Sequence, residues 1–216
     1  MQRLRIRFRR GEEIKFISHL DIIRLWERAL RRAQVNLAYS EGFSPRPRIS
    51  LAAPLSVGVT SEVELMDIYL TRTVSPHWLA AAVNRQLPPD MKILDVYPIA
   101  VGIPSLQSQV RYVEYKIEVT TEKESKDIES AISRLLSTEH LPWHHERDTG
   151  RRNYDLRALI DDICLINWCH SHCTVGMKLR CDNSGAGRPE QVALALGFNS
   201  YPQSIQRTKL YLRAQA

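Results

Sequence analysis

The chain is organised around the stretch Ser40-Glu41-Gly42-Phe43-Ser44-Pro45-Arg46-Pro47-Arg48-Ile49-Ser50-Leu51-Ala52-Ala53-Pro54. Gly42 can take a positive φ at little steric cost. Pro45 and Pro47 each fix φ, remove a backbone donor and move the preceding residue away from helical geometry. The stretch is therefore predicted to be a stiff, extended loop that leads into a strand.

Two arginines and one aromatic residue make this loop a candidate binding site. Arg46 and Arg48 lie two residues apart, so on an extended chain their side chains point the same way. Paired guanidinium groups on a rigid loop suit phosphate or carboxylate recognition. Phe43 could stack on a nucleic-acid base. The alternative is a structural elbow whose arginines are merely solvated.

Upstream of this loop, arginine alternates with apolar residues at the N-terminus, and this period of two predicts a half-buried strand. The apolar face carries Leu4, Ile6 and Phe8, and the other face carries Arg3, Arg5, Arg7 and Arg9. Four like charges on one face repel each other unless an anion or nearby acids offset them. The pattern favours an anion-binding surface that we expect to be exposed.

The sequence Ser18-His19-Leu20-Asp21 is a capping-box pattern, which predicts a helix that runs to about Ala33. Its apolar stripe contains Trp26, and a second stripe is basic and includes Arg28. Because the loop follows this helix directly, we expect Arg28, Arg46 and Arg48 to share one anion site. His19 is a weak candidate for a catalytic general base, and a structural role is the alternative.

The order of predicted elements up to residue 100 is β-α-β-β-α-β, the split βαβ arrangement of ferredoxin-like folds. Residues 101–109 have little periodicity and are interpreted as a linker. Residues 110–216 look like a looser repeat of residues 1–100. The predicted fold class is α+β, with two ferredoxin-like halves in tandem, antiparallel sheets and helices on one face. The boundaries and type of residues 158–168 stay open.

Composition limits the class of protein further. The chain has 216 residues and a formal net charge of +6, which favours a polyanionic partner. No apolar run approaches the roughly 20 residues of a membrane span, and no secretory signal is visible at the N-terminus. We therefore expect a cytoplasmic protein with reduced thiols and no membrane partner.

The cysteines are candidates for metal chemistry. Their spacing does not match the C-x3-C-x2-C motif of a radical SAM cluster. Cys169, His172 and Cys173 are weak candidates for a metal site, with His144 and His145 upstream. Incidental or buried thiols are the alternative, so no cofactor is expected. No nucleophile elbow and no matched acid pair is found, which favours a protein that is not an enzyme.

Three phrases resemble the radical-SAM-linked protein family, a domain of unknown function. They are residues 16–21 (Phe-Ile-Ser-His-Leu-Asp), residues 38–50, and residues 206–211 (Gln-Arg-Thr-Lys-Leu-Tyr). In that family the domain occurs alone or joined to a cobalamin-binding radical SAM protein. Its gene context implies ribosomal or transfer RNA. The paired halves are also similar to those of CRISPR repeat-processing endonucleases, a likeness of fold alone.

The hypothesis from sequence is a non-catalytic RNA-binding protein that presents ribosomal or transfer RNA to a radical SAM enzyme. One alternative is an endoribonuclease that uses His19, and another is a protein-interaction module with no RNA ligand. The residues expected to bind RNA are Arg3, Arg5, Arg7, Arg9, Arg28, Phe43, Arg46 and Arg48.

Overall fold

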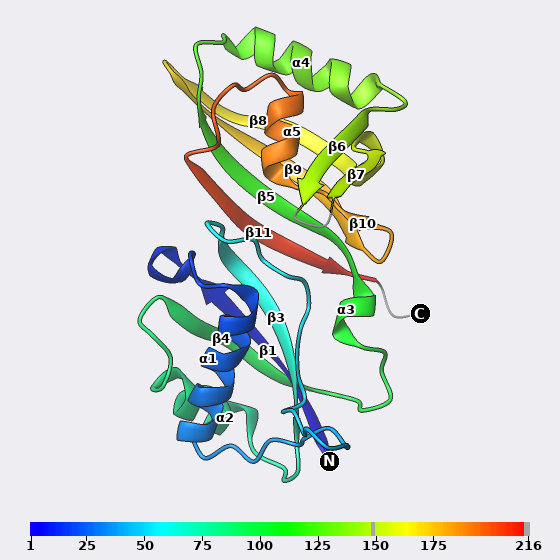
Figure 1. Ribbon diagram of the computed structural model, residues 1–216. Helices are drawn as coiled ribbons and strands as arrows, with labels where there is room; N and C mark the ends of the chain where they lie inside the picture. Colours follow the sequence, from blue (N-terminus) through cyan, green and yellow to red (C-terminus); the bar gives the residue numbers. More distant parts are fainter. Residues whose placement is uncertain (148–149, 214–216) are drawn as a thin grey trace. The chain divides into compact units, whose positions relative to one another are not determined.

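A computed structural model describes residues 1–147 and 150–213 (Figure 1). This part of the chain divides into two units, residues 1–110 and residues 111–213. Each unit combines antiparallel strands with α-helices, as the predicted α+β class requires. Within the described residues, none of the helices has the length and apolar character to span a membrane.

The first unit follows the predicted order of elements. Its strands lie side by side in the order β2-β3-β1-β4, and every pair is antiparallel. The elements are β1 (Gln2–Arg10), α1 (His19–Arg32), β2 (Ile49–Leu51), β3 (Thr60–Leu70), α2 (Pro76–Asn84), β4 (Met91–Ile99) and α3 (Leu106–Gln109), with a 3-10 turn at Glu12–Ile14.

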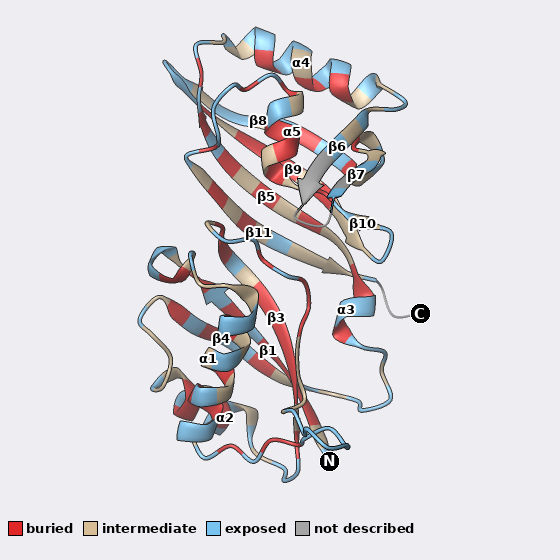
Figure 2. Ribbon diagram, in the orientation of Figure 1, coloured by how far each residue is buried: buried red, intermediate tan, exposed pale blue. Residues whose placement is uncertain are grey.

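The core of this unit lies between the sheet and its two longer helices. Apolar residues of β1 join a buried cluster with residues of α1 and α2, so both helices cover the same face. The rings of Phe8 and Trp26 meet edge to face, with centroids 4.9 Å apart. Ser18 caps α1 by accepting a hydrogen bond from the Asp21 backbone, as the sequence predicts. Figure 2 shows the buried residues of β1 and β3 in red.

The segment read as a linker belongs to the first unit and contains α3. Leu106 and Gln109 are buried there. The backbone carbonyls of Ile103 and Pro104 accept hydrogen bonds from the Arg3 guanidinium. These contacts make the segment a packed cover for one end of β1.

The second unit is also built on antiparallel pairs. In its main sheet β9 pairs with β8, with β10 and with β5, and β11 lies on the other side of β5. The strands β6 and β7 form a separate two-stranded sheet. Residues 158–168, left open by the sequence, form a 3-10 turn and most of β8. The elements are β5 (Val110–Thr120), α4 (Ser125–Ser137), β6 (Pro142–Arg147), β7 (Gly150–Asp155), a 3-10 turn (Arg157–Leu159), β8 (Ile160–Cys169), β9 (His172–Asp182), β10 (Gly185–Ala186), α5 (Pro189–Ala195) and β11 (Ser204–Leu212).

The turn between β9 and β10 is held by Asp182. Its carboxylate accepts hydrogen bonds from the Ser184 backbone, at 2.9 Å, and from Arg180 Nε, at 2.8 Å. Burial acts to raise the pKa of Asp182, but the hydrogen bonds from Ser184 and Arg180 outweigh it and lower the pKa to about 2. Because the pKa is depressed in the folded state, the ionised form stabilises the fold above the unfolded value and this contribution is lost as the pH falls through about 2.

We expect Asp182→Asn to lower the free energy of unfolding by about 1–2 kcal/mol at neutral pH. The deficit should shrink steadily below the ordinary Asp pKa, because wild type then loses the same charge. Urea unfolding at several pH values measures it, with Asp162→Asn, an exposed carboxylate on β8, as the control. A deficit that does not change with pH would show that Asp182 acts through its shape alone.

Candidate nucleic-acid interface

Arg3 and Arg5 are buried, contrary to the prediction that the whole arginine face of β1 is exposed. Only 1% of Arg3 and 3% of Arg5 is accessible. Both guanidinium groups bind the carboxylate of Asp67 on β3, with Arg3 Nη2 at 2.6 Å and Arg5 Nε at 2.7 Å. The mutual repulsion inferred from sequence is thus offset by an acid of the neighbouring strand, and neither residue is available to RNA.

The electrostatics of this cluster agree with a structural role. Burial acts to lower the pKa of Arg5, but the hydrogen bond and charge of Asp67 outweigh it, so the pKa lies above its ordinary value. Arg3 also donates to the carbonyls of Ile103 and Pro104. The pair therefore ties β1, β3 and the segment before α3 together.

Arg7 and Arg9 are exposed, as the strand pattern predicts. Arg7 lies opposite Asp95 of β4, and Arg9 lies opposite Lys92. Within the described residues neither guanidinium makes an ion pair or a hydrogen bond. Their face of the sheet is opposite to the one that α1 and α2 cover, because Leu4, Ile6 and Phe8 point the other way.

Residues 40–46 form a closed loop, called here the arm. The Ser40 N–H donates to the Arg46 carbonyl at 2.9 Å, and the Arg46 N–H donates to Ser40 Oγ at 3.0 Å. Gly42 has a φ of 116°, the left-handed geometry that glycine adopts without strain. Phe43, near the tip, is fully exposed, and Arg46 is exposed beside the closure.

The base of the arm is fixed to β3. The Tyr69 N–H donates to the Arg48 carbonyl, and the Arg48 N–H donates to the Ala38 carbonyl. The Arg48 guanidinium stacks over the Tyr69 ring, 4.0 Å from its centroid. Arg48 is therefore half-buried and part of the anchor of the arm.

The structure does not bring Arg28 to Arg48. Arg48 stacks on Tyr69, which lies opposite Arg3 in the register of β1 and β3. Cross-strand partners share a face of a sheet, so Arg48 belongs to the arginine face. Arg28 is exposed on α1, which packs on the other face through Trp26. Because Arg28 and Arg48 lie on opposite faces of the sheet, they cannot share one anion site.

His19 is half-buried at the start of α1. Burial lowers the pKa of its imidazole, the charge of Arg10 lowers it further, and the charge of Glu64 opposes both. A lowered pKa favours the neutral imidazole, which is the form that a general base uses. Arg10, however, donates to the carbonyls of Ile14, Lys15 and Ile17 and so holds the turn that leads into α1.

The candidate metal ligands lie at the β8–β9 turn. Cys169 and His172 are exposed and are paired in register, whereas Cys173 is buried. Neighbouring residues of a strand point to opposite faces, so His172 and Cys173 diverge. Burial raises the pKa of the Cys173 thiol, which disfavours the thiolate that metals bind. Among the described residues no group of three His, Cys, Asp or Glu side chains is placed so that it could hold a metal ion.

Sequence reasoning missed the roles of Asp67 and Arg10. Asp67 stands between the apolar residues Met66 and Ile68 in β3. An acid placed among buried apolar residues needs a cationic partner, and this was the available signal. Arg10 follows Arg9 directly and so breaks the alternation of β1. That break coincides with the irregularity between Phe8 and Arg10 in the pairing of β1 with β3.

The fold and this surface define an α+β protein with antiparallel sheets and a partly exposed basic strand. The chain belongs to the DUF2344 family, described as an uncharacterized protein conserved in bacteria, whose sequence profile matches residues 3–189. No curated protein matches the chain.

Solved structures show where a similar fold occurs. One is a chain of the "Crystal Structure of a Cbf5-Nop10-Gar1 Complex", with a TM-score of 0.54, 8% identity, and coverage of 96% of this chain and 48% of that one. Another is a chain of the "Crystal structure of the archaeal box H/ACA sRNP Nop10-Cbf5 complex", with a TM-score of 0.49, 9% identity, and coverage of 95% and 47%. This chain spans about half the length of those chains. At such identity the first likeness shows the fold alone.

Proposed function

We propose that this chain is a non-catalytic RNA-binding protein that holds single-stranded RNA with its arm and with Arg7 and Arg9. The observation that carries the proposal is Phe43, an aromatic ring fully exposed on a loop closed by two hydrogen bonds. Phe43 has the largest exposed fraction among the exposed large apolar side chains of the described residues, and an aromatic ring presented in this way offers a flat face for packing. A ring beside a free guanidinium is suited to a stacked base and its phosphate.

The charges of the first unit support an anionic partner. Arg7, Arg9 and Arg46 are exposed and, within the described residues, make no ion pair. Such groups release counterions when they neutralise phosphates, which is the main source of affinity for nucleic acids. Arg48, stacked on Tyr69, positions the arm in this proposal, and Arg28 on α1 is a separate, peripheral contact.

We further propose that residues 1–100 and residues 110–216 each form a ferredoxin-like half, and that residues 101–109, which pack with the first unit, connect the two halves. The strand orders β4-β1-β3-β2 and β11-β5-β9-β8 support this, since each is the 4-1-3-2 order of the split βαβ arrangement. In this reading the β6–β7 hairpin is an insertion in the second half.

The finer proposal is that the protein acts in the cytoplasm and presents ribosomal or transfer RNA to a radical SAM enzyme. It is supported by the resemblance of residues 16–21, 38–50 and 206–211 to the radical-SAM-linked family. Crosslinking in cells, followed by sequencing of the bound RNA and identification of co-purified proteins, tests it. Recovery of neither RNA nor a radical SAM protein would contradict it.

The direct test of RNA binding is Phe43→Ala. We expect the affinity for a labelled single-stranded RNA, measured by fluorescence anisotropy, to fall by about 1–3 kcal/mol because a stacked base loses its platform. Phe16→Ala is the matched control, since Phe16 is also an exposed phenylalanine of the first unit. Equal losses for both variants, or no loss for Phe43→Ala, would contradict the role of the arm.

A second comparison separates geometry from charge at Arg46. Arg46→Lys keeps the charge but loses the planar fork, so weaker binding by this variant indicates a bidentate phosphate contact. If Arg46→Lys binds RNA as tightly as wild type and Arg46→Ala binds more weakly, the site recognises the positive charge alone. Multiple-turnover RNA cleavage by the purified protein, abolished by His19→Ala, would instead establish the endoribonuclease alternative.

A further inference from the structure

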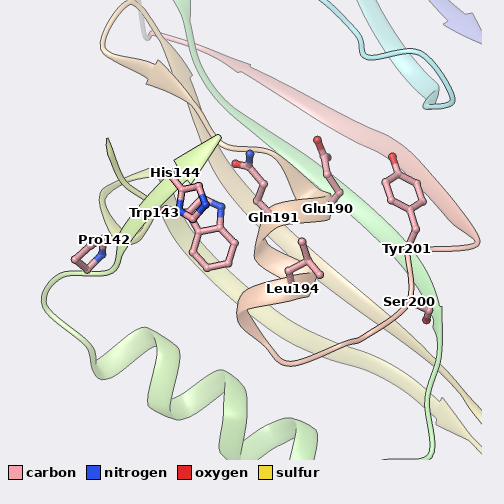
Figure 3. A pocket seen from close by; sticks show the side chains of 8 residues that line it. All are labelled: Pro142, Trp143, His144, Glu190, Gln191, Leu194, Ser200 and Tyr201. Carbon is pink, nitrogen blue, oxygen red and sulfur yellow. The ribbon is translucent and has the colours of Figure 1, made fainter. Parts of the chain in front are cut away.

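The second unit contains a cavity that no part of the proposed RNA interface uses. Its volume is about 680 Å³, within the usual range for small-molecule sites. Figure 3 shows Trp143 and His144 of β6 on one side, residues of α5 between, and Tyr201 on the other side. The complete lining is Pro142, Trp143, His144, Glu190, Gln191, Leu194, Ser200 and Tyr201.

The lining offers flat apolar surfaces. Trp143 is half-buried, whereas Leu194 and Tyr201 are exposed, with accessible fractions of 54% and 67%. Exposed aromatic and aliphatic side chains that share one cavity favour a ligand with an apolar face. An indole and a phenol suit a planar ring better than a bulky aliphatic group.

Gln191 supplies a polar group whose amide donors are not used within the described residues. The residue is 6% exposed, and its amide oxygen accepts a hydrogen bond from the Tyr154 hydroxyl. Within the described residues its amide nitrogen has no hydrogen-bond partner. An amide carries two N–H donors, and these are available to an acceptor on a ligand. A ligand that brings an acceptor to this position would satisfy them.

Glu190 supplies the complementary group. Its carboxylate lies 4.0 Å from Arg188 Nη1, a weak contact that leaves acceptor positions free. Glu190 and Tyr201 both line the cavity. Burial, and then the negative charge of Glu190, raise the pKa of Tyr201. A carboxylate accepts two donors from one ligand edge.

We propose that this cavity binds a guanine ring. Guanine presents adjacent N1–H and 2-amino donors for Glu190, and acceptors at O6 and N7 for the Gln191 amide. Adenine, cytosine and uracil each lack that pair of adjacent donors on one edge. The ring faces would pack against Trp143 and Tyr201. The guanine belongs to a free nucleotide or to an RNA base, and the site does not depend on the arm.

Calorimetric titration with guanosine, inosine and adenosine tests the proposal. Guanosine should bind at least tenfold more tightly than inosine, which lacks the 2-amino group, and adenosine should bind more weakly still. Glu190→Gln should abolish this discrimination, whereas Glu129→Gln, an exposed glutamate of α4, should not. Thermal melts of both variants verify that they fold, and Tyr201→Ala gives an independent loss of at least tenfold.

Two RNA pentamers separate the possible sources of the ring, one of uridine only and one with a single central guanosine. Tighter binding of the guanosine pentamer than of guanosine, dependent on Glu190, assigns the site to an RNA base; equal binding assigns it to a free nucleotide. No binding of guanosine, equal binding of adenosine, or selective binding of a trimethylammonium ion overturns the proposal. Phe43→Ala leaves the guanosine titration unchanged, so failure of the arm and failure of this cavity are distinguishable.

Discussion

Asp67→Asn should lower the free energy of unfolding by about 3–5 kcal/mol, because it removes the negative charge that two buried guanidinium groups share. Arg3 and Arg5 both bind this carboxylate, and all three side chains are at most 3% exposed. Without it, two positive charges face each other away from water. Urea unfolding at neutral pH measures the loss.

Asp95→Asn on β4 is the control, since Asp95 is exposed and surface substitutions usually change stability by less than about 0.5 kcal/mol. A triple variant that replaces Arg3, Arg5 and Asp67 by Met, Met and Leu should be more stable than Asp67→Asn, because no charge remains unpaired. An Asp67→Asn protein as stable as wild type would refute the structural role of the cluster.

The double variant Arg7→Glu, Arg9→Glu should weaken binding of single-stranded RNA by about tenfold or more at moderate salt, since it replaces two phosphate contacts by repulsion. The slope of log affinity against log salt should become shallower by about 0.7 for each phosphate that the variant no longer neutralises. Folding should survive, because both side chains are exposed and the apolar face of β1 is unchanged.

The control for this variant is Arg72→Glu, Arg85→Glu, which makes the same change in net charge at exposed positions of the first unit. If both double variants lose affinity equally, the RNA responds to total charge and β1 is not the interface. If neither double variant loses affinity for RNA while both variants remain folded, β1 carries no RNA site. That result would favour the alternative that the chain is a protein-interaction module.

The sequence by itself determined the local elements of the first unit. Alternation specifies β1, because a period of two places every second side chain on one face. The Ser18 cap specifies the start of α1. The arm follows from Gly42 and the two prolines, whose permitted dihedral angles depend on the residue type alone. Each of these features involves residues within a few positions of one another.

Only the tertiary structure decided which arginines are exposed and where a cavity forms. Arg3 meets Asp67 across 64 positions and the Ile103 carbonyl across 100. Trp143 and Tyr201 line the same cavity because the β6–β7 hairpin and the segment after α5 both border it. The alternation of residue types shows only which face of a strand a side chain lies on. Segments distant in the sequence decide whether the other face meets an acid, a carbonyl group or water. That neighbour in turn decides whether an arginine on this face is part of the fold or is free to bind a ligand.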